Sequence, residues 1–174
     1  IREGGAEGAT AFLKHGLDLR GLRRAGWVLI ALLLMPAIGV LEYGALRLGG
    51  INVPLPQLDL GATTLLFLTF SVGAFGEELG WQGYAYPALR TRLNVMGSSA
   101  VLGAIWALWH VIPFFELGRS SAWILWHSLS AVALRVIMLW LCENAGGRVL
   151  IAVPFDAMIN LSLQLSPQAG SVHD

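Results

Sequence analysis

The sequence predicts an all-α protein that crosses a membrane several times, and its composition and the length of its apolar runs carry that prediction. Of its 174 residues, 56% are hydrophobic and only 13% are charged, whereas about a quarter of the residues of an ordinary soluble domain are charged. The mean hydropathy is +0.66. Because so few charges cannot cover a water-facing surface, we expect lipid to surround most of the chain.

The apolar runs are long enough, or nearly so, to cross a bilayer core of about 30 Å, which takes about 20 helical residues. We expect five membrane helices, at 27–48, 60–76, 97–115, 121–142 and 149–165. The second can continue to residue 86, since Pro87 is the first firm stop, and 87–94 is expected at the membrane interface. Runs such as VLIALLLMPAIGVL are apolar all round, whereas a soluble helix has a polar face. Turns are expected at glycines 118 and 146–147.

By length the chain is one domain, with a polar cytoplasmic segment at 1–26, a membrane domain at 27–166 and a polar tail at 167–174. The start, without Met or a signal-peptide pattern, indicates a truncated chain.

Basic residues prefer the cytoplasmic side of short loops. A cytoplasmic N-terminus leaves only Arg47 and Arg119 outside, so we expect that orientation, in a multi-pass protein of a bacterial plasma membrane.

Charge and cysteine content exclude two other classes. The formal net charge is zero, which gives no basis for electrostatic attraction to nucleic acid. The single Cys142 excludes an internal disulfide framework. Membrane lipid is therefore the first expected partner, and the sequence does not indicate an oligomeric state.

Polar residues interrupt the apolar runs, where their cost in hydrocarbon means that they usually face the bundle interior and mark a functional site. Adjacent helix residues diverge by about 100°, so one residue of an adjacent glutamate pair can face a cavity while the other finds a partner. Residues four apart share a helix face, so Asp156 and Asn160 lie on one side of the last helix. The interrupting residues are Glu77, Glu78, Gln82, His110, His127, Arg135, Asp156 and Asn160.

Together these side chains provide acids, an imidazole and an amide from different helices. They suffice for a base that activates water and for donors that stabilise an oxyanion, and they could also hold a metal ion. Each has a structural interpretation as well: the glutamate pair can be a solvated helix end, and a lone histidine is more often packed than catalytic. We expect His127 to be structural. Asp156 is harder to explain in this way, because it lies well inside an apolar run.

Three segments, in this order, carry a resemblance to a known family: EELGWQGYAYPAL at 77–89, GAIWALWHVIPFF at 103–115 and GGRVLIAVPFDAMINLS at 146–162. They resemble the CPBP family of intramembrane proteases. That family includes the type II CAAX prenyl endopeptidases and the bacteriocin-processing or bacteriocin-immunity proteins. The resemblance covers roughly residues 60–165 and implies a helical membrane protease domain.

The resemblance implies roles for the matching residues. Glu77, paired with Glu78, would activate the attacking water. His110, which follows the aromatic Trp106 by four residues, would stabilise the oxyanion together with Asn160, or would hold a metal.

The resemblance leaves the cofactor open, because the family has been interpreted both as metalloproteases and as glutamate-dependent proteases. If a cofactor is present, we expect zinc or another divalent metal. His110 and Asp156 are then the expected ligands, since imidazole and carboxylate both ligate zinc.

Two positions depart from the family pattern. Gln82 stands where the family has an arginine, and Asp156 stands where it has a histidine. An ionised aspartate can ligate a metal but cannot donate a hydrogen bond to an oxyanion. The lost arginine leaves the glutamates without a counter-ion, and we expect Arg135 to replace it. The alternative is that Arg135 extends to the cytoplasmic interface.

The sequence therefore predicts an intramembrane endopeptidase for a membrane-associated or lipid-modified protein or peptide, with a water-filled cavity open to the cytoplasm. The alternative is a catalytically degenerate relative that acts as an immunity or partner-binding protein, which Gln82 and Asp156 favour. A small transporter would also use intramembrane acids, but the ordered motifs give it no support.

Overall fold

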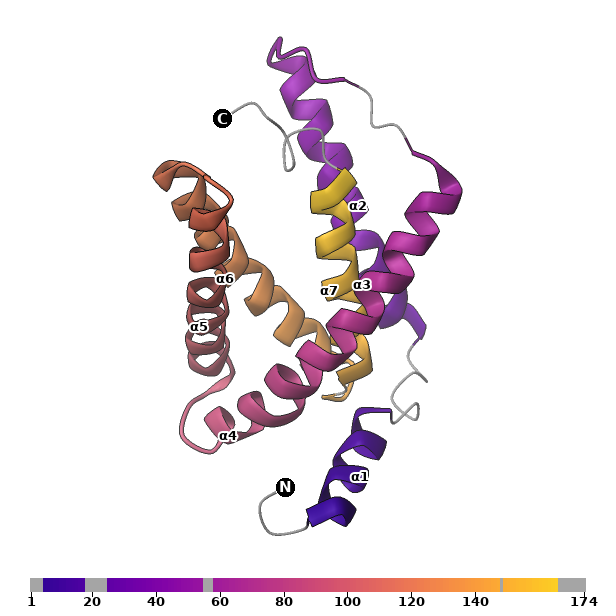
Figure 1. Cartoon of the computed structure of the whole chain (residues 1–174), viewed down its shortest axis with the longest axis vertical. Helices are drawn as coiled ribbons and strands as arrows, with labels where there is room; N and C mark the ends of the chain where they lie inside the picture. The colour runs from indigo at the N-terminus through magenta and orange to yellow at the C-terminus, as the bar shows by residue number, and fades with distance from the viewer. Residues whose placement is uncertain (1–4, 18–24, 55–57, 148, 166–174) are drawn as a thin grey trace.

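The computed structural model describes residues 5–17, 25–54, 58–147 and 149–165, and the regular structure within them is helical (Figure 1). The helices are α1 (Gly5–Gly16), α2 (Ala25–Leu48), α3 (Leu60–Gly80), α4 (Tyr86–Arg90), α5 (Val95–Glu116), α6 (Ser121–Asn144) and α7 (Val149–Leu165), with a π-helical turn, Trp81–Ala85, between α3 and α4. The all-α prediction is confirmed. The predicted tail, 167–174, lies outside the described residues.

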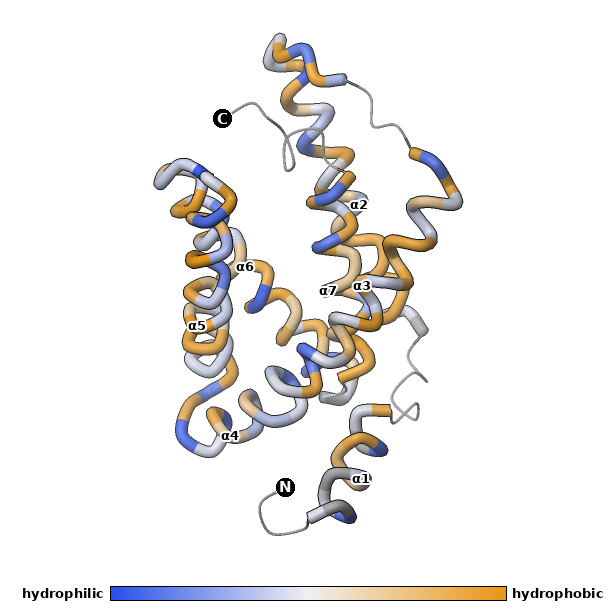
Figure 2. The backbone as a smooth tube through the Cα atoms, in the orientation of Figure 1, coloured by the Kyte–Doolittle hydropathy of each residue, from blue (hydrophilic) through white to orange (hydrophobic). Residues whose placement is uncertain are grey.

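Four helical stretches in the described part of the chain are long and apolar enough to cross a membrane: Gly26–Leu48, Leu60–Arg90, Val95–Glu116 and Ser121–Asn144. The fifth predicted span is α7, a shorter apolar helix of 17 residues, which is about 25 Å long at 1.5 Å per residue. Hydrophobic residues predominate along the length of these helices, with polar positions between them (Figure 2). The polytopic bundle is thus observed, with four full-length spans and one short apolar helix.

The second span is longer than the sequence predicted. A stop was expected at Pro87, but the helix continues through α4 to Arg90. Proline normally breaks a helix because it lacks an N–H and its ring clashes with the carbonyl four residues back. The π-helical turn accommodates Pro87, because the Tyr86 N–H bonds to the carbonyl of Trp81, five residues back. The expected stop at Pro87 is therefore wrong.

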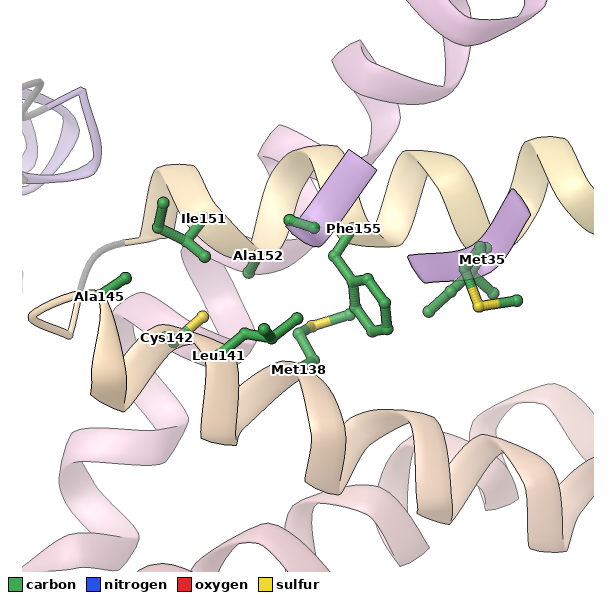
Figure 3. Packing of buried hydrophobic residues seen from close by; sticks show 10 residues of the cluster. Met35, Met138, Leu141, Cys142, Ala145, Ile151, Ala152 and Phe155 are labelled. Carbon is green, nitrogen blue, oxygen red and sulfur yellow. The ribbon is translucent and has the colours of Figure 1, made fainter. Parts of the chain in front are cut away.

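α7, which carries the third sequence motif, lies at the centre of the packing. It runs along α2 and α3 and also contacts α6 (Figure 1). Its Ile151 and Phe155 pack with Met138 and Leu141 of α6 and with Met35 of α2 (Figure 3). Because three helices pack against α7, its polar residue Asp156 is buried in protein.

α5 and α6 form a closely packed antiparallel pair (Figure 1). Gly103 of α5 permits the close approach, since a Cβ there would lie 3.1 Å from the Cα and 3.2 Å from the carbonyl oxygen of Val132. Gly118, with φ 73°, follows α5, and Gly146 and Gly147, with φ 95° and 74°, follow α6. Glycine adopts these left-handed conformations at little cost. The turns occur where the sequence predicted them.

The sequence did not predict α1, because it assigned 1–26 only a polar segment. Phe12 of α1 packs against the apolar cluster between α3 and α7 and lies against Gly83. At the end of α1, a Cβ on Gly16 would come within 2.3 Å of the Leu79 side chain. α1 therefore lies against the C-terminal end of α3. A helix of 12 residues is marginal in isolation and gains its stability from packing, which a local pattern does not reveal.

Candidate active site

The two glutamates of the first motif lie in the last turn of α3 and have different partners. Glu78 is fully buried, whereas the Glu77 side chain is 35% exposed. Nη1 of Arg135, on α6, donates to both carboxylate oxygens of Glu78, at 2.7 Å and 2.8 Å. The indole N–H of Trp106, on α5, donates to Glu77. One glutamate is thus paired in the interior while the other stays accessible, as expected from their angular separation.

Arg135 is fully buried and links α6 to the first two motifs. Its Nη2 lies 3.9 Å from Oε1 of Glu77, and its Cζ lies 4.5 Å from the centre of the Trp106 ring, in cation–π contact. Its Nε and Nη2 have no hydrogen-bond partner in the described part of the protein. The prediction that Arg135 faces the glutamates is confirmed, and the alternative of an interfacial Arg135 is wrong.

Asp156 adds a third acid from α7. It is 1% exposed, and one oxygen from each of Glu77, Glu78 and Asp156 lies within 4.8 Å of the other two. The Asp156 Oδ2 atom is buried without a hydrogen-bond partner among the described residues. Nδ2 of Asn160 donates to the backbone carbonyl of Asp156 at 3.0 Å and lies 3.5 Å from Oδ1. The first and third motifs therefore meet, as predicted.

His110 is connected to this group through Trp106 rather than through a carboxylate. Its Nδ1 lies 2.8 Å from the Trp106 carbonyl oxygen. Because a carbonyl only accepts, Nδ1 carries the hydrogen, and Nε2 of the neutral ring is left as an acceptor. The His110 ring also packs edge-on against Trp106, with centroids 4.8 Å apart. His110 is not part of the group of mutually close acidic oxygens. Trp106 thus contacts Glu77 with its indole and His110 with its backbone.

His127 was expected to be structural, and its contacts are those of a packed ring. It stacks on Trp123 with centroids 4.5 Å apart and meets Phe114 edge-on at 4.6 Å. These contacts lie beside the C-terminal part of α5, where Phe114 also stacks on His110, with centroids 5.9 Å apart.

Gln82 is buried one turn beyond Glu78, and its Oε1 has no hydrogen-bond partner among the described residues. It borders a cavity of about 370 Å³ whose other walls include Tyr86, Arg90 and Glu143. Tyr86 donates a hydrogen bond of 2.8 Å to Glu143, 57 residues away. Sequence reasoning missed Tyr86 and Glu143, because no local spacing connects residues so far apart.

Comparison with known proteins identifies the family. Residues 59–162 match the sequence model described as type II CAAX prenyl endopeptidase Rce1-like. The chain belongs to this family. It is also similar to the CAAX prenyl protease 2 of Methanococcus maripaludis, with 32% identity over 109 residues, which are 58% of this chain and 40% of that protein. The part of this Rce1-like chain that matches the relative covers 40% of the relative's length, and the residues matched by the family model, 59–162, contain the whole acidic group.

The carboxylates of the acidic group lie close enough together to hold a metal ion, but their composition and contacts differ from those of a typical zinc site. Zinc in proteins is held mostly by histidine nitrogen and cysteine sulfur, but the mutually close ligand atoms here are oxygens of Glu77, Glu78 and Asp156. Both Glu78 oxygens already accept hydrogen bonds from Arg135. A dication among these oxygens would also be repelled by the guanidinium. Among the described residues, the cation that contacts the two glutamates of this group is Arg135.

Proposed function

We propose that the chain is an intramembrane endopeptidase that hydrolyses a peptide bond in a lipid-modified or membrane-associated protein or peptide. This proposal rests on the contrast between the two glutamates. The accessible Glu77 is oriented by Trp106, whereas Glu78 is buried and paired with Arg135. A general base must be reachable by water and fixed in orientation. The name of the Methanococcus maripaludis relative supports a prenylated CAAX-type substrate, and a bacterial plasma membrane is the location that we propose.

In this mechanism Glu77 takes a proton from a water molecule while the oxygen of that water attacks the peptide carbonyl. Nε2 of His110 is an acceptor when Nδ1 is bonded to the Trp106 carbonyl, so a neutral His110 assists the water rather than the oxyanion. In this mechanism the Asn160 amide gives up its long 3.5 Å hydrogen bond to Asp156 Oδ1 and donates that N–H to the oxyanion. Glu77 then returns the proton to the departing amine, which completes the hydrolysis.

Substrate and water reach this group, in the proposal, from the cavity beside Gln82. The cavity is bordered by Arg90 and Glu143, so its mouth is polar although the surrounding helices are apolar. Under the proposed orientation this mouth faces the cytoplasm, and the lipid-modified end of the substrate stays in the bilayer.

A cleavage assay tests the proposal. Purified protein in lipid nanodiscs is incubated with a farnesylated CAAX-type peptide and with its unmodified counterpart, and the products are identified by mass spectrometry. We expect cleavage of the lipid-modified peptide, and a loss of roughly 100- to 10,000-fold in Glu77→Gln, the usual contribution of a general base. The control is Glu116→Gln, at the exposed end of α5.

A parent protein that cleaves neither peptide, or a Glu77→Gln variant as active as the parent, would contradict the proposal. The degenerate, partner-binding alternative would then be favoured. Asp156 is the feature behind that alternative, since an ionised aspartate in the third motif cannot donate a hydrogen bond.

A further inference from the structure

The cavity beside Gln82 contains a buried amide oxygen that has no partner. Gln82 is 4% exposed, and its Oε1 accepts no hydrogen bond from the described part of the chain. The same side chain lines the cavity. Because an unpaired buried acceptor is costly, this oxygen indicates a ligand that brings a hydrogen-bond donor into the cavity.

Arg90 supplies a positive charge to the same cavity. Its Nη1 donates to the carbonyl oxygen of Leu93 at 2.6 Å, and its guanidinium lies next to the Tyr86 hydroxyl. A guanidinium has five N–H groups, so Arg90 can keep both contacts and still donate to an anion. The planar arrangement of these donors matches the two oxygens of a carboxylate.

Glu143 of α6 limits which anion fits. Its Oε1 already accepts a hydrogen bond of 2.8 Å from Tyr86, and its charge repels a small free anion at Arg90. A ligand that carries both a carboxylate and N–H donors fits better, because it matches Arg90 as well as the unpaired oxygen of Gln82. The carboxyl-terminal end of a peptide carries both groups.

The depth of the cavity also suits a charged ligand. Counted from its N-cap, Asp59, α3 crosses a bilayer core of about 30 Å within about 20 residues, near Gly80. Gln82 and Arg90 follow this point, so a carboxylate bound there does not enter hydrocarbon. The two residues are about 12 Å apart along the helix, which an extended peptide covers with about three to four residues.

We propose that this cavity binds the carboxyl-terminal end of the substrate. The free carboxylate binds the Arg90 guanidinium, and a backbone N–H of the same peptide donates to Oε1 of Gln82. Arg90 therefore determines specificity for a short segment with a free carboxyl end, and no covalent bond is made in the cavity. The inference rests on the proposed peptidase function, but the binding itself can be measured without cleavage.

A binding experiment tests the carboxylate contact in the Glu77→Gln variant, where a bound peptide stays intact. A labelled farnesyl peptide with a free carboxyl end is compared with the same peptide amidated at that end, by fluorescence anisotropy in nanodiscs with empty nanodiscs as the blank. We expect about tenfold tighter binding of the free acid, a modest preference because Arg90 is exposed. Arg90→Gln should remove the preference and Arg90→Lys should keep most of it.

Arg92→Gln is the matched control, since Arg92 is exposed and does not line the cavity, and it should keep the full preference. In the parent, the same preference should raise KM for the amidated peptide and leave kcat nearly unchanged. Equal affinity for both peptides, or a preference that persists in Arg90→Gln, would overturn the inference. If the parent cleaves both peptides with the same KM, the peptidase stands and the inference fails; if the preference is present but nothing is cleaved, the inference stands and the peptidase fails.

Discussion

Arg135 of α6 binds Glu78 of α3 through both carboxylate oxygens, at 2.7 Å and 2.8 Å, and both side chains are fully buried. The two residues are 57 positions apart, whereas the family pattern places an arginine four residues after Glu78, where this chain has Gln82. The positive charge at the glutamate pair therefore comes from a different helix. The paired Glu78 fixes Arg135, and Arg135 in turn lies against Trp106 and near Glu77.

Trp106→Phe should lower the cleavage rate more than it lowers stability. Phenylalanine keeps a ring under the Arg135 guanidinium but removes the indole N–H that orients Glu77. A hydrogen bond to a charged group is worth about 1.5–3 kcal/mol, which corresponds to roughly a tenfold to hundredfold loss in kcat/KM. The control is Trp109→Phe on the exposed side of the same helix. Equal rates for Trp106→Phe and the parent would show that this hydrogen bond does not orient the base.

Gly103→Ala should weaken the α5–α6 pair and displace Arg135. The added Cβ would meet the Val132 backbone at 3.1 Å and 3.2 Å and the Arg135 Cβ at 3.3 Å, and backbone atoms cannot move aside as a flexible side chain can. Overpacking of this kind typically costs about 1–3 kcal/mol. Thermal unfolding in detergent measures the effect. Gly73→Ala on α3 is the control, since a Cβ there has no neighbour within 4 Å; a similar effect of both substitutions would contradict the close-packing account.

The orientation in the membrane can be tested by cysteine labelling in intact cells. The native Cys142 is fully buried and should not react, so single cysteines can be added to the parent sequence. Ser120→Cys, between α5 and α6, should be labelled by an impermeant reagent from outside. Thr91→Cys, between α4 and α5, should be labelled only after the cells are opened. The reversed pattern would show that the positive-inside prediction is wrong for this chain.

The protein should not retain stoichiometric zinc after purification in detergent, and chelators should leave cleavage unchanged. Arg135 already supplies the cation beside Glu77, Glu78 and Asp156. Elemental analysis of the parent and of Asp156→Ala measures this directly. One zinc ion per parent chain that disappears in Asp156→Ala would mean that the acidic group is a metal site after all.

Much of this arrangement was predictable from sequence, because lipid imposes simple rules on long apolar runs. The runs predicted the five apolar helices to within a few residues. The arginine of the family pattern that is missing at Gln82, together with the cost of an unpaired buried charge, predicted that Arg135 would face the glutamates. The continuation of the helix beyond Pro87 was not predicted, because it depends on a π-helical turn that no residue pattern predicts. The Tyr86–Glu143 contact and the shared use of Trp106 by Glu77 and His110 depend on how the helices cross, which helical periodicity does not determine.

The central claim is that Arg135 replaces the missing arginine of the first motif. The most direct test removes the guanidinium at position 135 and restores an arginine at position 82. Arg135→Leu leaves the buried Glu78 unpaired, at a cost of about 3–5 kcal/mol, so unfolding in detergent should show a large loss of stability together with a loss of cleavage. Restoring the family residue in that background, Gln82→Arg, puts a guanidinium one helical turn from Glu78 and should recover most of both. Arg92→Leu, at an exposed position, is the control. An Arg135→Leu protein as stable and active as the parent, or a double variant no better than Arg135→Leu, would contradict the account.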